Sequence, residues 1–304
     1  MADISDNELR EIYDFAVQLG KDAGAMLMKA ARSRFDGSAS QVFTEKESSV
    51  DLVTKTDTEV EAFIHNAITN KYPSHKFIGE ETYSAGASRD YLVDDSPTWI
   101  IDPLDGTVNF THLFPIFCVS IGFAIKGKPV IGVINAPFLN QTFSSCKGHG
   151  AWMNETQRLP LVLSPLPANA PSGCVESFVN MAAERGGRDG KGGMVHGMRS
   201  LGSATLDLAY VAMGSFDIWW EGGCWEWDVA AGIAIVEEAG GLVTIANPPE
   251  DTAVIPETKL GSRLYLAIRP AGPSDTETGR QAQERVVRET WKRVRQLDYS
   301  RPGA

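Results

Sequence analysis

A short acidic segment offers the clearest chemistry in the chain: residues 99–110 read WIIDPLDGTVNF. Its apolar start predicts a strand that ends at Asp102, and Pro103 and Gly106 then predict a tight turn. Such a turn would aim Asp102, the Leu104 carbonyl and Asp105 at one point. Oxygen ligands that converge in this way suit a hard cation such as Mg²⁺. Taken alone, the two aspartates could equally make Asx-turn hydrogen bonds.

Two further acidic positions strengthen the metal interpretation. Glu80 and Glu81 end a predicted strand, where paired carboxylates repel each other unless solvent or a cation neutralises them. Asp228 lies at the mouth of an apolar helix, where a plain N-cap would also explain it. The acids that follow a strand or begin a helix are then Glu80, Asp102, Asp105 and Asp228. Burying them together without cations would be costly, so they predict a divalent metal site.

The charge balance favours a small anionic substrate. The 28 Lys and Arg against 39 Asp and Glu leave a net charge of −11, which repels nucleic acid and anionic membranes. Neither is an expected partner, and bound cations would reverse this field locally. Two ions roughly 3.5–4 Å apart would hold the attacking and leaving oxygens of an in-line displacement. The predicted reaction is phosphoryl transfer to water.

The bulk composition indicates a soluble globular protein. Its 304 residues, 43% of them apolar, can bury one large core or two fused smaller ones. The four cysteines show no CxxC spacing, which fits a reducing, cytoplasmic setting without a zinc site or disulfide framework. Residues 1–10 are polar and acidic, unlike a signal or transit peptide. The longest apolar region, 118–134, is interrupted at 126–129 and predicts two strands and a turn, not a membrane span.

Helical and strand patterns alternate along the chain, which predicts packed α/β layers. Apolar residues at three- and four-residue steps over 7–32 predict a long amphipathic helix. Thr56 and Glu59 have the form of a capping box and predict a second helix to about residue 71. Further helices are expected at 204–213, 229–239 and 283–296. Strands are expected at 76–79, 98–101, 117–124, 130–136, 141–145 and 173–178, with a mobile loop at 36–49 and a flexible one at 184–193.

Five motifs together resemble the inositol monophosphatase family, within the superfamily of lithium-sensitive phosphatases and fructose-bisphosphatase. They lie at 51–57 (DLVTKTD), 79–81 (GEE), 99–110, 199–204 (RSLGSA) and 227–241, and the resemblance extends over 11–246. It implies an α+β fold, a layered αβαβα sandwich of the sugar-phosphatase type. Residues 1–150 would form an α+β half with most metal ligands, and 151–304 an α/β half that completes one catalytic unit. Homodimers are common in the family, so a homodimer is expected.

The resemblance also implies roles for the acidic residues. Glu80, Asp102 and the Leu104 carbonyl would hold a first Mg²⁺, and Asp102, Asp105 and Asp228 a second, with Glu80 helping to seat a third ion. Thr107 would activate the attacking water, with Asp57 accepting a hydrogen bond from its hydroxyl. A threonine hydroxyl is a poor base by itself, so a neighbouring carboxylate and the metals must supply the driving force. Without the resemblance, Asp57 is better explained as a helix cap beside Thr56.

Substrate contacts follow from the same resemblance. Gly106 and Thr107 are expected to begin a short helix whose N–H groups face the phosphate. Glu221 would accept hydrogen bonds from vicinal hydroxyls and repel a second phosphate, although an ordinary solvated glutamate would also fit the sequence. The expected substrate-binding residues are Asp105, Gly106, Thr107, Gly202, Ser203, Ala204, Glu221 and Asp228. A monophosphorylated polyol is the predicted ligand.

The family match leaves the substrate open. It implies hydrolysis of myo-inositol monophosphate to inositol and phosphate, dependent on Mg²⁺ and inhibited by Li⁺. The alternative is a monophosphatase for another sugar or polyol phosphate, such as the paralogues found beside quinate-utilisation genes in fungi. A bisphosphate nucleotide phosphatase fits Glu221 less well, and a catalytically silent paralogue would be expected to lack a metal ligand. The chain departs from the family pattern at 222–226 (GGCWE), at 184–193 and beyond 261, which affects substrate identity and not reaction class.

Overall fold

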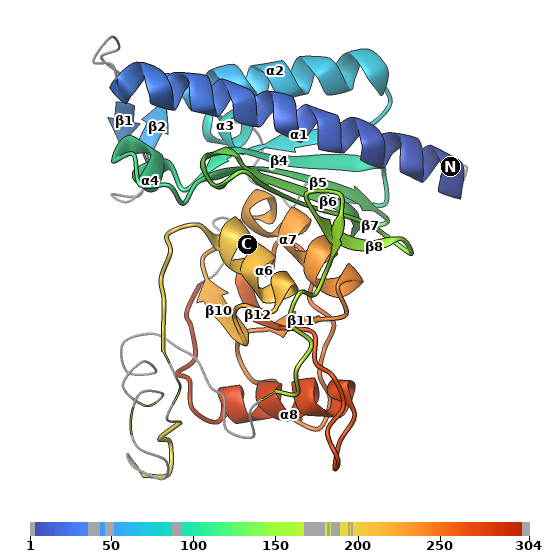
Figure 1. Ribbon diagram of the computed structural model, residues 1–304, viewed down its shortest axis with the longest axis vertical. Helices are drawn as coiled ribbons and strands as arrows, with labels where there is room; N and C mark the ends of the chain where they lie inside the picture. The colour runs from blue at the N-terminus through green and yellow to red at the C-terminus, as the bar shows by residue number, and fades with distance from the viewer. Residues whose placement is uncertain are drawn as a thin grey trace.

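Helices and sheets of the computed structural model stack in alternating layers: helices, a large sheet, helices, a small sheet and a last helix (Figure 1). The structure describes residues 4–35, 43–45, 52–86, 93–166, 180, 183, 189–193, 195 and 197–299. The layering confirms the expected α+β fold of αβαβα type. The expected strand at 173–178 and much of the loops at 36–49 and 184–193 lie outside the described residues.

The first layer consists of α1 (Asp6–Phe35) and α2 (Lys55–Lys71), which cover one face of the large sheet (Figure 1). Between them in the chain lies an antiparallel pair, β1 (Phe43–Glu45) and β2 (Leu52–Thr54). The apolar stripe predicted for the first helix is confirmed. It buries side chains at three- and four-residue steps: Ile12, Ala16, Leu19, Ala23 and Leu27.

The start of α2 differs from the sequence prediction. Because β2 leads directly into the helix, α2 begins at Lys55 and Thr56 is its second residue. A capping box places its serine or threonine just before the helix, so the expected capping box of Thr56 and Glu59 is wrong. Glu59 instead forms an exposed ion pair with Lys55, one turn earlier.

The second layer is a seven-stranded sheet in the order β3-β4-β5-β6-β7-β8-β9. Strands β3 and β4 run parallel, and the other neighbouring pairs are antiparallel. Two short helices, α3 (Glu80–Ser84) and α4 (Thr107–Thr111), follow β3 and β4 almost at once. The strands are β3 (Lys76–Gly79), β4 (Thr98–Asp105), β5 (Cys118–Ile125), β6 (Lys128–Ala136), β7 (Gln141–Cys146), β8 (Gly150–Met153) and β9 (Gln157–Arg158), with a 3-10 turn η1 (Pro137–Leu139) before β7.

Strand β4 continues beyond the predicted end at Asp102. Asp102 pairs with Ser120 and Asp105 with Cys118, and the register shifts between these two pairs. Pro103 lies within the shift, where it has no N–H to give to the ladder. A local irregularity of this kind re-aims side chains at a strand end.

The remaining layers are built from the second half of the chain. Helices α6 (Ala204–Met213) and α7 (Glu226–Glu238) cover the other face of the large sheet (Figure 1). Beyond them lies an antiparallel sheet in the order β10-β12-β11, made of β10 (Ile218–Gly222), β11 (Leu242–Ile245) and β12 (Leu264–Ile268), with α8 (Gly279–Trp291) packed outside it. Helix α7 touches the large sheet at Gly132, where a Cβ atom would lie 2.2 Å from the Ala231 carbonyl oxygen. This close approach packs the backbone of α7 directly against β6 of the large sheet.

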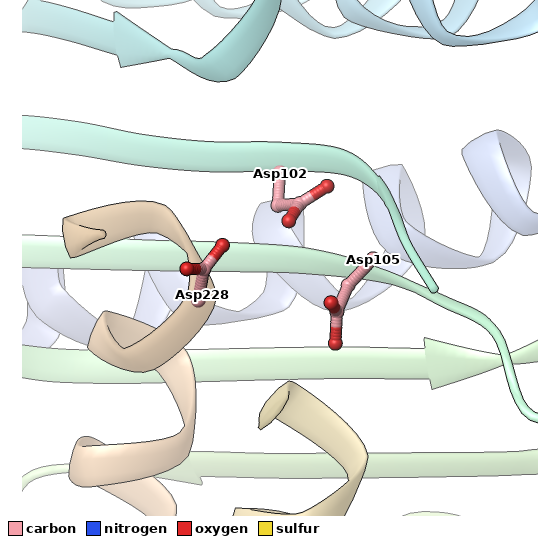
Figure 2. A group of neighbouring side chains, drawn as sticks. All are labelled: Asp102, Asp105 and Asp228. Atoms are coloured by element: carbon pink, nitrogen blue, oxygen red, sulfur yellow. The ribbon is translucent and has the colours of Figure 1, made fainter. Parts of the chain in front are cut away.

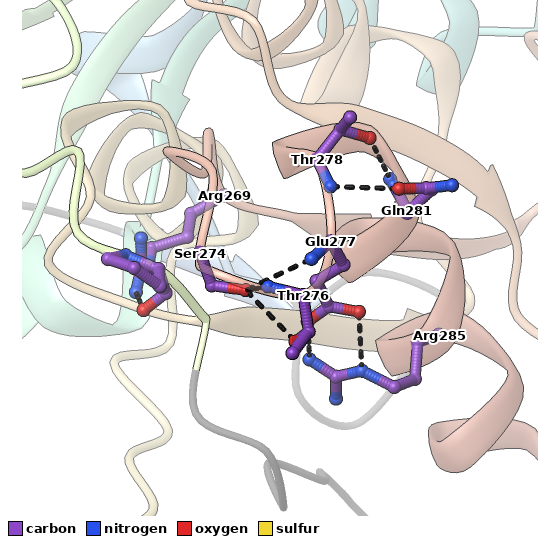
Figure 3. Close-up of polar contacts among 8 residues, drawn as sticks. Arg269, Ser274, Thr276, Glu277, Thr278, Gln281 and Arg285 are labelled. Carbon is purple, nitrogen blue, oxygen red and sulfur yellow. Dashed lines mark hydrogen bonds and ion pairs between the residues drawn. The ribbon is translucent and has the colours of Figure 1, made fainter.

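The C-terminal helix begins earlier and ends earlier than the predicted 283–296 (Figure 3). The Thr278 hydroxyl accepts a hydrogen bond from the Gln281 N–H at 3.2 Å, and the Gln281 side chain accepts one from the Thr278 N–H at 2.8 Å. This capping box fixes the start of α8. The predicted apolar face is confirmed for Val286, Val287 and Trp291, which are buried.

A buried arginine joins the end of β12 to the segment after β9 (Figure 3). Arg269 is 3% exposed and donates to the carbonyl oxygens of Ser164, at 2.7 Å, and Pro165, at 3.1 Å. It also pairs with Asp217 at 2.7 Å. These bonds satisfy a guanidinium that would be costly to bury alone.

Cys118, Cys146 and Cys224 are buried free thiols. Among the described helices, none combines the length and apolar character that crossing a bilayer requires.

Candidate active site

Three aspartates meet where β4 ends and α7 begins (Figure 2). Asp102 and Asp105 come from β4, and Asp228 comes from the first turn of α7. One carboxylate oxygen of each lies within 4.8 Å of those of the other two. Asp102 is 1% exposed, whereas the other two are partly accessible. The fold therefore gathers three of the four predicted metal-binding acids into one cluster.

Asp102 is held by its own turn. Its Oδ1 accepts a hydrogen bond from the Leu104 N–H at 2.9 Å. The Asx turn considered as an alternative to a metal site is therefore present, and it coexists with the cluster. It orients the carboxylate and does not keep it away from the other aspartates.

Asp228 is held by the start of α7. It is the third residue of the helix, and its Oδ2 accepts from the N–H of the N-cap residue Trp225 at 2.6 Å. The interpretation of Asp228 as an N-cap is wrong, because its side chain reaches back to the cap and does not form it. The Asp228 carbonyl also accepts from the Thr205 hydroxyl at 2.8 Å, which links α7 to α6.

Asp105 is tied to the start of α6. Its Oδ2 accepts from the Ser203 hydroxyl at 2.5 Å and from the Thr205 N–H at 2.9 Å. Ser203 is itself the N-cap of α6 and accepts from the Leu206 N–H at 3.2 Å. The predicted substrate-side residue Ser203 thus contacts a predicted metal ligand directly.

Burial raises the pKa values of all three carboxyl groups, and the charges of neighbouring acids raise those of Asp102 and Asp228 further. Desolvation is the largest cause in each case. The charges of Glu80, Asp105 and Asp228 raise the pKa of Asp102 further, to well above its usual range. Hydrogen bonds from Ser203 and Thr205 oppose the rise in the pKa of Asp105. The aspartates therefore compete with one another for the ionised state.

A divalent cation would relieve this competition. Within the part of the chain that the structure describes, no lysine, arginine or histidine forms an ion pair with the three aspartates. All their donor atoms are carboxylate oxygens, the ligands that Mg²⁺ prefers. The residues present fit a hard divalent cation.

Glu80, the fourth predicted ligand, lies beside the cluster and not within it. It is the first residue of α3 and follows β3. Gly79 pairs with Ile101 in parallel, so Glu80 and Asp102 come next at the same level of the two strands. The charge of Glu80 raises the pKa of Asp102 and of Asp228, so Glu80 lies close enough to act on both.

The turn after β4 carries the residues predicted to act on water and phosphate. Gly106 has a φ of 87°, and a Cβ atom there would lie 2.7 Å from the Ile116 carbonyl oxygen. The glycine is therefore required by the backbone itself. Thr107 begins α4 as expected, and its hydroxyl donates to the Leu104 carbonyl at 3.0 Å. Asp57 is buried in the first turn of α2, and its pairing with Thr107 stays a prediction.

Asn109 joins this turn to the segment before α6. Its Nδ2 donates to the carbonyl oxygens of Ile116, at 2.7 Å, and Leu201, at 2.8 Å. Gly202, with a φ of 73°, lies directly against the Asn109 side chain, and Ala204 begins α6. Sequence reasoning gave Asn109 no role, although its place two residues after Thr107 was a usable signal.

Two more acids lie on the side of the site formed by α6 and β10. Glu221 is accessible to solvent and accepts from the Trp219 Nε1–H at 3.0 Å, while the surrounding protein raises its pKa to about 7 through desolvation.

Asp207 is 7% exposed, and its Oδ1 has no hydrogen-bond partner among the described residues. Burial first, and then the charges of Glu221 and Asp105, raise the pKa of Asp207 to about 8. Sequence reasoning missed Asp207, although a lone acid in the apolar run of 204–213 was a signal.

Aromatic rings fill the space between α3 and the start of α7. The rings of Trp225 and Trp227 stack at 5.3 Å, and Tyr83 packs at 5.2 Å from the first and 5.1 Å from the second. The Arg263 guanidinium lies over Trp225, 3.7 Å from the ring centroid. Glu226, the other unusual residue of this segment, is 1% exposed. Trp225, from the segment expected to depart from the family pattern, therefore adds to an aromatic cluster beside Glu80 and Asp228.

Comparison with known proteins identifies the family. The model of the inositol monophosphatase family matches residues 8–295. "Quinic acid degradation cluster protein x" of Neurospora crassa is 66% identical, over 98% of this chain and 97% of that protein. "Inositol monophosphatase 2" of Saccharomyces cerevisiae is 40% identical, over 84% and 87%. The solved structure of the Thermotoga maritima IMPase matches with a TM-score of 0.67 and 27% identity, over 92% and 97% of the two chains. The chain therefore belongs to the inositol monophosphatase family of phosphatases.

Proposed function

We propose that the chain is a Mg²⁺-dependent phosphomonoesterase that hydrolyses a monophosphorylated polyol, with myo-inositol monophosphate as the first candidate substrate. The observation that carries the proposal is the cluster of Asp102, Asp105 and Asp228, whose carboxylate oxygens lie within 4.8 Å of one another. Buried acids without a cationic partner are costly, and divalent ions offset that cost.

Two or three Mg²⁺ ions would be held by oxygen atoms from both halves of the chain. The three aspartates are the proposed central ligands, and Glu80 and the Leu104 carbonyl would add further oxygens. Mg²⁺ bound there would polarise a phosphoryl oxygen and stabilise the charge that develops during displacement. The chain itself would supply rigid ligands, because each aspartate is fixed by a backbone N–H.

Thr107 and Asp57 are the proposed partners of the attacking water. Thr107 begins α4, and its hydroxyl can rotate from the Leu104 carbonyl towards another acceptor. Asp57 would take that hydrogen bond, which would leave the Thr107 oxygen free to accept one from water. Asp105, Gly106 and Thr107 would line the phosphate side of the site.

Glu221 and the segment of Gly202, Ser203 and Ala204 would contact the polyol. Glu221 is accessible, and its Trp219 hydrogen bond fixes the carboxyl group without blocking it. A carboxylate accepts hydrogen bonds from two vicinal hydroxyls and would repel a second phosphate. This arrangement favours a substrate with a single phosphate.

A phosphorylated polyol other than inositol is the second candidate. The Neurospora crassa relative, at 66% identity, is named for a quinic acid degradation cluster, and Protein qutG of Emericella nidulans is 63% identical. The aromatic cluster of Tyr83, Trp225 and Trp227 would also shape the surroundings of a substrate bound at Asp228. Both observations support a substrate that differs from inositol in its ring substituents.

The test is phosphate release from a panel of substrates, with Mg²⁺, with a chelator, and with added Li⁺. The panel holds inositol 1-phosphate, glucose 1-phosphate, fructose 1,6-bisphosphate, adenosine 3′,5′-bisphosphate and a phosphorylated polyhydroxy ring acid. We expect Mg²⁺-dependent, Li⁺-sensitive release, fastest from inositol 1-phosphate. Faster release from the ring acid would favour the second candidate. Release from no member would favour a catalytically silent protein.

A further inference from the structure

A carboxylate is buried on the face of α2 that packs against the core. Val60, Ile64 and Ile68 of this face are at most 1% exposed, and Glu61 beside them is 4% exposed. A carboxylate in such a place destabilises the fold unless hydrogen bonds replace its water. The groups that donate hydrogen bonds to Glu61 therefore indicate what its carboxylate does in the fold.

Those partners are the first turn of α3. Glu61 Oε2 accepts from the Glu81 N–H at 2.7 Å, and Oε1 accepts from the Thr82 N–H at 2.7 Å and the Thr82 hydroxyl at 2.5 Å. Glu81 and Thr82 are the second and third residues of α3, whose N–H groups have no partner within the helix. The N-cap residue Gly79 has no side chain to offer. A residue from another helix thus supplies the cap.

Gly79 gives Glu61 the room to do so. A Cβ atom on Gly79 would lie 2.4 Å from Glu61 Oε2 and 2.8 Å from Phe77 Cε1. The backbone of Gly79 is extended, with a φ of −128°, so the requirement is for space and not for an unusual conformation. Glycine at the end of β3 is therefore matched to the Glu61 carboxylate.

The turn that Glu61 caps is the one that begins with Glu80. Gly79, the last residue of β3, pairs in parallel with Ile101 of β4, so Glu80 and Asp102 follow this pair at the same level. We propose that Glu61 is a positioning residue for the divalent metal site, because it fixes the first turn of α3 and thereby holds Glu80 towards the three aspartates. This inference rests on the proposed function to the extent that the cluster binds Mg²⁺.

The test compares Glu61→Gln with Glu59→Gln, which removes one exposed acid from the same helix. The amide retains the volume of Glu61 and one acceptor oxygen, and it loses at least one of the two backbone bonds. Mg²⁺ and Mn²⁺ affinities are measured by calorimetry, alongside melting temperature and the Mg²⁺ dependence of phosphate release. We expect Glu61→Gln to bind both metals roughly 10-fold or more weakly than the unmodified protein does. This is the range found when residues that orient metal ligands are changed. Glu59→Gln should bind as the unmodified protein does.

A second variant keeps the test informative if Glu61→Gln folds poorly. Thr82→Val removes the hydroxyl bond and leaves both backbone bonds to Glu61, so it should weaken metal binding, by less than Glu61→Gln does. At saturating Mg²⁺, kcat should stay within about twofold for both variants, because Glu80 is then held by the ion. A role confined to stability would lower the melting temperature of the metal-free protein and leave the affinity unchanged.

The outcomes separate this inference from the proposed function. Unchanged affinity in both variants overturns the inference and leaves the function standing. An unmodified protein that binds Mg²⁺ but releases no phosphate overturns the function, and weaker binding by the variants still supports the role of Glu61. An unmodified protein that binds no divalent ion overturns both.

Discussion

The Ser203 hydroxyl donates a hydrogen bond to Oδ2 of Asp105 at 2.5 Å while it accepts one from the Leu206 N–H at 3.2 Å. One hydroxyl therefore caps α6 and orients an acid of the central cluster. The residues expected on the substrate side and those expected on the metal side are connected by this contact, and so are the two halves of the chain.

Ser203→Ala should show both roles of this hydroxyl. Loss of an N-cap costs about 0.5–2 kcal/mol of stability, and loss of the bond to Asp105 should raise the Mg²⁺ concentration for half-maximal activity roughly 10-fold. Thermal unfolding and Mg²⁺ titration of phosphate release measure the two effects. Thr278→Ala is the matched control, because Thr278 caps α8 far from the cluster. Equal Mg²⁺ dependence in the two variants would show that Ser203 acts only as a cap.

The pH dependence of metal binding follows from the raised pKa values of Asp102, Asp105 and Asp228. Because the metal-free carboxyl groups hold protons to higher pH than ordinary aspartates, Mg²⁺ must displace those protons. The affinity should therefore rise with pH, by up to about tenfold per unit for each proton displaced. Calorimetry at pH 6, 7 and 8, in buffers of different ionisation enthalpy, measures affinity and proton release together. Binding that is independent of pH and releases no proton would contradict the mutual repulsion inferred here.

Asp207→Asn should stabilise the metal-free protein at high pH. The folded-state pKa of Asp207, about 8, exceeds the ordinary value of 3.8, so the folded state holds the proton more tightly. Its contribution to stability is greatest below pH 4 and falls as the pH rises towards 8. Asparagine cannot ionise, so the variant should gain about 1–4 kcal/mol over the unmodified protein between pH 5 and pH 8.

Unfolding of both proteins in a chelator at the two pH values measures this difference, and other titrating groups cancel in the comparison. A difference in stability that does not change with pH would show that Asp207 ionises at its ordinary pKa.

Glu221→Ala should weaken recognition of the polyol hydroxyls more than recognition of the phosphate. Removal of an acceptor for ring hydroxyls should raise KM for the preferred polyol phosphate by about 10-fold and change KM for an aryl phosphate little. The aryl phosphate serves as the internal control, since it shares the phosphate contacts and lacks the hydroxyls. Steady-state kinetics on both substrates measure the split, and equal increases would mean that Glu221 does not contact the hydroxyls.

Much of the candidate site could be predicted from the sequence, because its acids follow apolar strands or begin a helix. The apolar run before Asp102, with Pro103 and Gly106 after it, indicated that Asp102 and Asp105 converge, and the structure places them together. The strand was predicted to end at Asp102, whereas β4 continues to Asp105 with a register shift. The proposed role of Asp228 as a metal ligand needed the family motif, because an isolated acid at a helix start also suits a cap. Strand spacing alone could not show that α7 would approach the sheet at Gly132.

Other features depend on tertiary contacts that local patterns do not encode. Glu61 and Asp207 occur in helical patterns where an acid on the buried face is hard to tell from one at the surface. Thr56 had the form of a cap but is the second residue of α2, since β2 enters the helix without a loop. At the other end of the chain, Thr278 and Gln281 form a real capping box that the apolar period alone did not indicate.

The central claim is that the three clustered aspartates bind the divalent ions on which phosphate release depends. The most direct measurement is Mg²⁺-dependent phosphate release from inositol 1-phosphate by Asp105→Asn, with circular dichroism to establish that the variant is folded. We predict a folded protein whose activity is lower than that of the unmodified protein by roughly 100-fold or more. Its Mg²⁺ binding should also be weaker, since one oxygen ligand loses its charge. Near-normal turnover by a folded Asp105→Asn protein would contradict the assignment of the site.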